Sequence, residues 1–436
     1  MGGQLQQRLA RANPIIFTAV AGLAGFCAYF SMYAFRKPFS AATFEAVPGW
    51  HFTLDYKIAL VLAQVAGYAL SKLIGIKVIS ELSPAKRGMA ILLLIGASWL
   101  ALVGFAVIPA PWNVALLFFN GLPLGMIWGL VFGYMEGRRV SEALGAILCA
   151  SFILSSGVVK SLGAWLVTSA HVTEFWMPAA AGAAFFPLLL LSVWMLGQLP
   201  PPSPADEAQR VKRAPMSSTE RAAFLAAYWP GIVLLTASYI LLTAFRDFRD
   251  NFAAEVWTAL GYGHESGVFT QSELPVAAIS LVALAAVMAV RDNLKALMVI
   301  HAIVVAGFVL LGASAWAFEA HLISPLTFMI TAGAGLYMAY TPFNAMLFDR
   351  LVAFSGRIAT AGFLIYVADA SGYLGSAALL VWRNFGAVKM DWLRFFILSA
   401  YATSAVGAVL ATAAAIYFLR QGRAAPGPAP AVMPAA

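Results

Sequence analysis

The segment GMAILLLIGASWLALVGFAVIP, residues 88–109, carries no charged side chain. Roughly 20 consecutive apolar residues allow a helix to cross the hydrocarbon core of a bilayer, so this segment predicts a transmembrane helix. The whole chain has the same character, with 62% hydrophobic and 11% charged residues among 436, whereas about a quarter of the residues in a soluble domain are charged. A soluble chain of this length has no core large enough for so much apolar surface, and we therefore expect lipid to be one of its solvents.

Further segments of this length and character recur along the chain. They predict twelve spans, near residues 14–37, 57–79, 88–109, 112–134, 143–169, 174–197, 228–247, 266–290, 294–317, 322–347, 358–383 and 393–419. The first of them is longer than the apolar core of a signal peptide, so we interpret it as a true span. Twelve spans place both chain termini on one side of the membrane.

One long polar segment interrupts the series. The stretch from Leu199 to Ala222 contains the run Pro200-Pro201-Pro202 and several charges, a composition typical of a linker. We predict an N-terminal six-helix half at residues 1–198, a cytoplasmic linker at 199–225, a C-terminal six-helix half at 226–421 and a disordered tail, rich in Ala and Pro, at 422–436.

Basic residues gather in the loops on the side of the termini. They are Arg8, Arg11, Lys86, Arg87, Arg138, Arg139, Arg210, Lys212, Arg213, Arg221, Arg291, Lys295, Arg350, Arg357, Arg420 and Arg423. Positively charged loops stay in the cytoplasm, so we expect a multi-pass protein of the cell inner membrane with both termini cytoplasmic. The same rule accounts for the net charge of +8, and no nucleic-acid partner is needed to explain it.

The two halves share short motifs at a nearly constant offset. Ala34-Phe35-Arg36 near the end of span 1 matches Ala244-Phe245-Arg246 near the end of span 7, 210 residues later (246 − 36). Ser156-Gly157 in span 5 matches Ser371-Gly372 in span 11, 215 residues later (371 − 156). Such a parallel duplication is typical of the major facilitator fold. We therefore predict an all-α membrane protein whose twelve transmembrane helices form two pseudo-symmetric six-helix bundles.

Arg36 and Arg246 are the main candidate binding residues. A charge at membrane depth costs about 3 kcal/mol or more, so it needs a partner, a cavity or a function. Equivalent positions on spans 1 and 7 face each other across the central cavity of a duplicated transporter, and the planar guanidinium suits bidentate binding of phosphate or carboxylate. The two arginines thus predict a clamp for an anion. Snorkelling of Arg36 and Lys37 to the interface is the alternative.

Further charges complete the predicted site. Lys37, Lys72 and Lys160 join the arginines, and we expect Lys160 in mid-span 5 to pair with Asp369 on span 11. Asp369 and Glu273 are candidate coupling or charge-balancing residues, Glu273 at the outer, partly hydrated end of span 8. For Asp247 and Asp250 a simpler interpretation is that they only neutralise the neighbouring arginines in ion pairs at the membrane surface. Basic residues outnumber acidic ones in this set, which predicts a positive cavity and an anionic ligand.

Four stretches on spans 1, 2, 4 and 7 are similar to the motifs of one branch of the major facilitator superfamily, the organophosphate:phosphate antiporters. They are Tyr29 to Phe39, Tyr68 to Gly75, Gly121 to Trp128 and Tyr239 to Arg246. The resemblance implies that Arg36 and Arg246 are the paired phosphate-binding arginines and that Lys37 and Lys72 are supporting cavity lysines. The chain departs from that branch in span 5, which lacks its histidine, and in the loop after span 2. Around Phe132 to Arg139 it looks closer to an uncharacterised bacterial group of the superfamily.

The sequence predicts a secondary active transporter that moves a small anionic solute, an organophosphate or a phosphate-like ion, by alternating access and exchange. Inorganic phosphate is the expected counter-substrate. A proton- or sodium-coupled symporter of a carboxylate or another organic anion is the first alternative, with Asp369 or Glu273 as the coupling site. A membrane receptor or sensor that binds its ligand without moving it is the second.

Other functional classes find little support in the residues. No nucleophile–base pair, metal-ligand set or phosphate loop stands out, so we expect neither an enzyme nor a protein with a cofactor or bound metal. The expected partners are the solute and membrane lipid, and the expected state is a monomer.

Overall fold

The computed structural model describes residues 2–135, 138, 140–203, 206, 218–355, 361–386 and 390–424. The predicted linker lies largely outside these residues, and the predicted tail lies outside them from residue 425 onward. Helix α10 begins at Ser218, within the range predicted as linker, and α17 continues to Ala424.

The helices of the N-terminal half are connected by short loops and 3-10 turns. In chain order they are α1 (Gly2–Ala10), α2 (Pro14–Tyr33), η1 (Pro38–Ala41), α3 (Tyr56–Glu81), η2 (Pro84–Lys86), α4 (Arg87–Val107), α5 (Val114–Leu124), α6 (Ile127–Phe132), α7 (Ser141–Thr168) and α8 (Met177–Gly197). Pro14 occupies the first turn of α2, where its missing N–H has no helical partner to lose, and Asn13 caps that turn by accepting from the backbone N–H of Ile15.

The C-terminal half repeats this plan. Its helices are α10 (Ser218–Asn251), α11 (Ala253–Ala259), α12 (Val268–Met288), α13 (Asn293–Glu319), α14 (Pro325–Ala345), α15 (Leu347–Ser355), α16 (Ala361–Phe385) and α17 (Trp392–Ala424). Within the described residues, ten helical segments are long and apolar enough to cross a membrane. Helices α14 and α16, richer in Gly, Tyr and polar residues, lie at the other two predicted spans. The prediction of a twelve-helix membrane protein is confirmed.

The packing inside each half shows the duplication. Helix α2 packs on α7 and α8, just as α10 packs on α16 and α17, and α4 packs on α5 and α8 as α13 packs on α14 and α17. The pair α3–α5 likewise has its counterpart in α12–α14. These five N-terminal contacts therefore recur between the equivalent C-terminal helices, and the two bundles are pseudo-symmetric.

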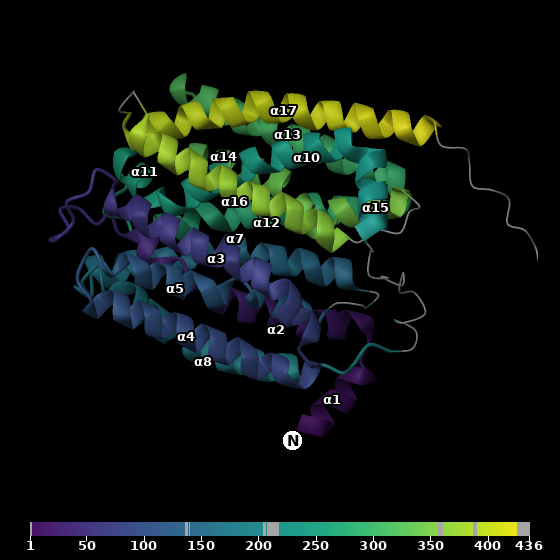
Figure 1. Cartoon of the computed structure of the whole chain (residues 1–436), viewed down its shortest axis with the longest axis horizontal. Helices are drawn as coiled ribbons and strands as arrows, with labels where there is room; N and C mark the ends of the chain where they lie inside the picture. The colour runs from purple at the N-terminus through teal and green to yellow at the C-terminus, as the bar shows by residue number, and fades with distance from the viewer. Residues whose placement is uncertain are drawn as a thin grey trace, which may run out of the picture.

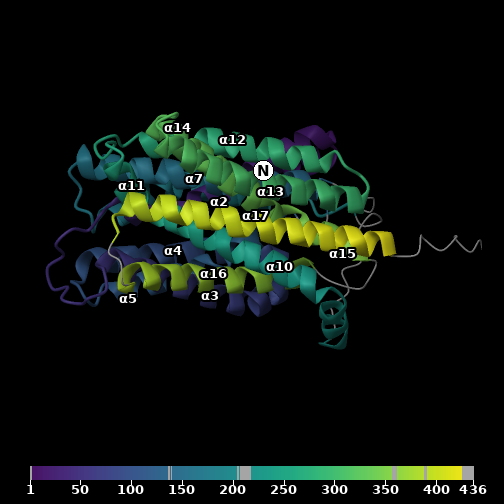
Figure 2. The same ribbon diagram turned by 90° about the horizontal axis from the view of Figure 1, so that it is seen from above.

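The two halves contact each other mainly through α3 and α7 of the first half and α12, α14 and α16 of the second. Figure 1 shows α2 to α8 in the lower part and α10 to α17 in the upper part, with all long helices running in roughly one direction. Helix α3 lies beside α16, and α7 lies beside α12 and α14, in this view and in the view from above (Figure 2). We call the end of the bundle that carries both termini the terminal side, and the opposite end the far side.

Candidate functional site

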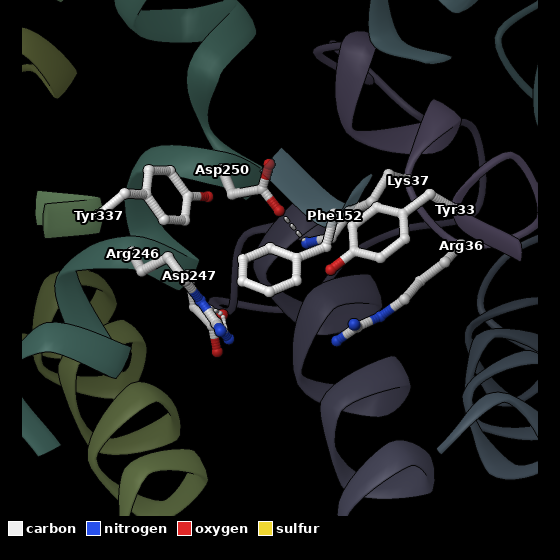
Figure 3. Close-up of a pocket in the computed structure, with 8 residues that line it drawn as sticks. All are labelled: Tyr33, Arg36, Lys37, Phe152, Arg246, Asp247, Asp250 and Tyr337. Atoms are coloured by element: carbon white, nitrogen blue, oxygen red, sulfur yellow. Dashed lines mark hydrogen bonds and ion pairs between the residues drawn. The ribbon is translucent and has the colours of Figure 1, made fainter. Parts of the chain in front are cut away.

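A small polar pocket lies between the halves. Its lining comes from α2 and the turn after it, from α7, α10 and α14: Tyr33, Arg36, Lys37, Phe152, Arg246, Asp247, Asp250 and Tyr337. In Figure 3, Arg36 lies on one side and the Arg246–Asp247 pair on the other, with the rings of Tyr33 and Phe152 between them. Both predicted arginines thus contribute to the same pocket, one from each half.

Arg36 reaches the pocket from a turn, not from a helix. Helix α2 ends at Tyr33, and the turn that follows it leads to Pro38, which has no N–H to continue a helical ladder. The Arg36 residue is 5% exposed, and its guanidinium lies 3.9 Å from the centroid of the Tyr68 ring. Its Nε atom has no hydrogen-bond partner. Because this side chain is buried, the alternative of snorkelling to the interface is wrong. Among the described residues, no carboxylate forms an ion pair with Arg36.

Arg246 carries its own counter-charge. Its Nε and Nη2 atoms donate to Oδ1 of Asp247 at 3.2 and 2.6 Å, and its Nη1 donates to the Tyr340 hydroxyl. The other oxygen of Asp247, Oδ2, is buried without a partner. The two arginines are therefore not equivalent: Arg246 has an ion pair with a carboxylate, whereas Arg36 has none among the described residues.

Asp250 joins the halves at the centre of the pocket. One oxygen, Oδ2, lies 2.5 Å from Nζ of Lys37, and the other, Oδ1, accepts from Nζ of Lys160 at 2.8 Å and from the Ser156 hydroxyl. Lys37 also donates to Oδ1 of Asn251 at 2.9 Å. The residues Lys37, Lys160 and Asp250 are 3%, 1% and 7% exposed. The interpretation of Asp250 as part of an ion-pair cap at the membrane surface is wrong, because residues of the other half enclose this carboxylate.

The predicted Lys160–Asp369 pair is also wrong. The residue equivalent to Asp369 in the first half is 154 (369 − 215), six positions from Lys160, which is about 9 Å along a helix. Because of this difference in depth, Lys160 forms its ion pair with Asp250, and Asp369 forms one with Lys72. The Nζ atom of Lys72 binds Oδ2 of Asp369, and the Tyr239 hydroxyl donates to Oδ1 at 2.5 Å.

Glu273 is buried within the C-terminal half. Its Oε1 accepts from Nη1 of Arg249 at 2.6 Å, and Arg249 donates from Nη2 to the carbonyl of Met329 at 3.1 Å. The prediction of a hydrated position at the end of span 8 is wrong because α7 covers this residue. Gly157 provides the room: a Cβ there would lie 2.8 Å from Cβ and Cγ of Glu273.

Comparison with known proteins gives a family for this chain. Residues 38–421 match the model of DUF5690, a family of unknown function. The chain belongs to this family. No curated protein sequence matches the DUF5690 chain.

Solved structures similar to the DUF5690 chain are membrane transporters. A D-xylose–proton symporter has a TM-score of 0.61 at 16% identity, over 93% of this chain and 97% of the other. The nucleoside transporter NupG has a TM-score of 0.59 at 15% identity, over 92% and 99%. A bacterial homologue of the human drug peptide transporters PepT1 and PepT2 has a TM-score of 0.60 at 15% identity, over 93% and 98%.

These likenesses confirm the major facilitator fold of a multi-pass membrane protein. The similarity to the organophosphate:phosphate antiporter branch stays a prediction, as does the placement of the termini in the cytoplasm of an inner membrane.

The central charges of the DUF5690 chain are unevenly shared between its halves. Ten charged side chains lie in and next to the pocket, namely Arg36, Lys37, Lys72, Lys160, Arg246 and Arg249, with Asp247, Asp250, Glu273 and Asp369. Six are basic and four are acidic, so the set has a net charge of +2. The four from the N-terminal half are all basic, whereas the six from the C-terminal half sum to −2.

The ion pairs between the halves follow from this division. In each of the four that connect described residues, the cation belongs to the N-terminal half and the carboxylate to the C-terminal half. The fourth is on the far side, where Nζ of Lys57 lies 2.6 Å from Oε1 of Glu255 and donates to the carbonyl of Ser40 at 3.0 Å. The sequence analysis did not predict this pair, although Lys57 and Glu255 carry opposite charges near the far-side ends of two predicted spans.

Proposed function

We propose that this chain is a secondary transporter that carries a small anion across the membrane by alternating access, in exchange for another anion. The observation that carries the proposal is Arg36. This side chain is buried between the halves of a transporter-like fold, lines a pocket and has no carboxylate partner among the described residues. A buried cation without a counter-charge is strongly unfavourable, and an anion bound in the pocket removes that cost.

The other predicted site residues have defined places in this scheme. Arg36 binds the anion directly, and Arg246, already held by Asp247 and Tyr340, presents the opposite wall. Lys37 and Lys160 share the single carboxylate of Asp250, so they leave a second positive charge uncompensated. Lys72 is balanced by Asp369 and Arg249 by Glu273. The net charge of +2 therefore favours a ligand with negative charge.

Exchange follows from the same balance. Closing an empty pocket buries the uncompensated charges, whereas closing a loaded pocket buries them beside an anion. The energetic cost of moving between the two open states is therefore lower for the loaded protein. The similar solved structures, a symporter and transporters of other solutes, support a transport role for this fold.

The test is uptake into liposomes that contain the purified protein. Labelled phosphate, glycerol 3-phosphate and lactate are offered outside, with the same anion inside or absent, to wild type and to Arg36→Gln. We expect uptake of at least one anion that requires internal anion, and a loss of about 10- to 100-fold in Arg36→Gln, since a hydrogen-bonded charge contributes about 1.5–3 kcal/mol.

Arg394→Gln is the matched control. Arg394 forms an ion pair with Glu319 at the surface, where the side chain is 53% exposed, so its removal should leave uptake unchanged. Equal uptake by wild type and Arg36→Gln would contradict the role of Arg36, and no uptake of any of the three anions would refute the function. Uptake driven by a proton or sodium gradient without internal anion would replace exchange by symport.

A further inference from the structure

The carboxylate of Asp250 is held entirely by donors from the other half. Lys37 immediately precedes η1, and Lys160 and Ser156 lie one turn apart on α7, so that two ammonium groups and one hydroxyl meet at the two carboxylate oxygens. Figure 3 shows Asp250 extending from its helix toward Lys37 across the pocket. This donor trio of Lys37, Ser156 and Lys160 is defined by the N-terminal half alone.

The donor trio has the chemistry of a carboxylate site. Charge-assisted hydrogen bonds from ammonium groups are the strong ones, and here each oxygen of one planar group receives at least one. Without the carboxylate, two lysines that are 3% and 1% exposed would repel each other with no counter-charge. The trio therefore needs a carboxylate in every conformation in which it is shielded from water.

Asp250 cannot supply that carboxylate in both states of an alternating-access cycle. It belongs to α10, which also begins the far-side connection through α11 to Glu255, the partner of Lys57. When the halves separate on the far side, α10 moves away from α7 and η1, and Asp250 leaves the trio with it. The trio then faces the opened pocket with two free cations.

We propose that Lys37, Lys160 and Ser156 form the subsite for a carboxylate group of the transported solute, and that Asp250 occupies this subsite as an internal substitute while the far side is closed. The inference rests on the proposed function and narrows its substrate class from small anions to small organic acids. A planar carboxylate fits donors arranged around two oxygens. The solute and Asp250 compete for the same donors, so binding of the solute favours opening on the far side.

The first test removes the internal carboxylate. Asp250→Ala, purified in detergent, should melt several degrees below wild type, because it leaves two buried lysines unpaired. Sodium acetate at tens of millimolar should restore much of that loss by filling the vacated place, whereas sodium chloride and sodium phosphate at equal ionic strength should not. Wild type should respond equally to all three salts.

Two variants control for a general effect of acetate. Asp250→Asn keeps the volume of the side chain, so no room is left and no rescue is expected. Asp250→Ala with Lys160→Met lacks one of the donors and should lose the rescue. A folded Asp250→Ala protein that gains no more from acetate than from chloride would overturn the subsite, and so would equal rescue of the variant without Lys160.

A second measurement applies if Asp250→Ala does not fold. Ala254 on α11 is 6% exposed on the far side, and Ala254→Cys in the otherwise unchanged chain reports its opening to a maleimide reagent. Propionate should raise the labelling rate several-fold above that with uncharged propionamide, with the protein lacking the added cysteine as background. Equal rates with both compounds would overturn the proposal.

The outcomes distinguish a failure of the carboxylate subsite from a failure of the transport function. Acetate rescue without anion uptake in liposomes would leave the subsite standing and refute the transport function. Uptake that depends on Arg36 without rescue or propionate-dependent labelling would leave the function standing and refute the subsite.

Discussion

Lys72 and Asp369 should be energetically coupled, and the coupling can be measured. Their ion pair connects α3 to α16, on the terminal side of the pocket, and their side chains are 20% and 7% exposed. Asp369 also accepts from Tyr239, and Nζ of Lys72 lies 5.6 Å and 5.5 Å from the ring centroids of Tyr68 and Tyr373. Removal of one partner leaves the other charge in a poorly hydrated place, which costs about 3–5 kcal/mol for a fully buried pair.

The surroundings of each residue set the expected size. Lys72→Met leaves Asp369 with the Tyr239 hydroxyl alone, and we expect a loss of about 3 kcal/mol in the free energy of unfolding. Asp369→Asn leaves the more exposed Lys72, which retains its two rings and some water, and we expect about 2 kcal/mol. The double variant leaves no uncompensated charge and should also lose only about 2 kcal/mol, so the coupling energy is about 3 kcal/mol.

The assay is unfolding of the purified protein by increasing sodium dodecyl sulfate in mixed micelles, for wild type, both single variants and the double variant. The surface pair Arg394–Glu319, with side chains 53% and 37% exposed, supplies a matched cycle in which the coupling should stay below about 1 kcal/mol. A double variant that loses as much as both single variants together would refute the reasoning, because the two charges would then act independently.

Two further perturbations test the contacts between the halves. Lys57→Met removes the far-side ion pair with Glu255. It should raise the rate of maleimide labelling of Ala254→Cys about 10-fold, which corresponds to about 1.4 kcal/mol. An unchanged labelling rate would show that this pair does not hold the far side closed. Gly157→Ala introduces a Cβ 2.7 Å from the carbonyl oxygen of Phe269, so α7 and α12 must separate and stability should fall by about 1–3 kcal/mol. Gly96→Ala, where nothing lies within 4 Å, should be neutral or slightly stabilising, and equal effects at both glycines would contradict the close approach.

The spans could be predicted because the bilayer imposes their length. The uncharged segment at residues 88–109 became α4 (Arg87–Val107), and ten other predicted spans likewise coincide with long helices. The span predicted at 112–134 is divided into two shorter helices, α5 and α6. The duplicated Ala-Phe-Arg motif also predicted correctly that two distant residues lie near each other, since Arg36 and Arg246 line one pocket. Both inferences rest on properties that a linear sequence carries, namely segment length and internal repetition.

The pairing of the charges could not be predicted in the same way. Asp250 and Glu273 lie near the ends of apolar segments, where a charge usually indicates the membrane surface. Helix α10 nevertheless continues to Asn251, because its charges are matched by lysines of the other half and by Glu273. The depth at which Lys160 meets a partner depends on how two helices are staggered, and neither hydropathy nor the repeat offset determines this stagger within one helical turn.

In the transporter that we propose, the division of charge between the halves gives the anion a mechanical role. Every described ion pair across the interface places the cation on the N-terminal half and the carboxylate on the C-terminal half, so the halves attract each other through these pairs. An anion that binds to the cations of the N-terminal half competes with the carboxylates of the C-terminal half and weakens that attraction. A cationic solute is disfavoured here, because the ten charges in and next to the pocket have a net charge of +2 and repel it. The same residues that recognise an anion therefore also determine how easily the halves separate, which couples binding to movement without a separate gate.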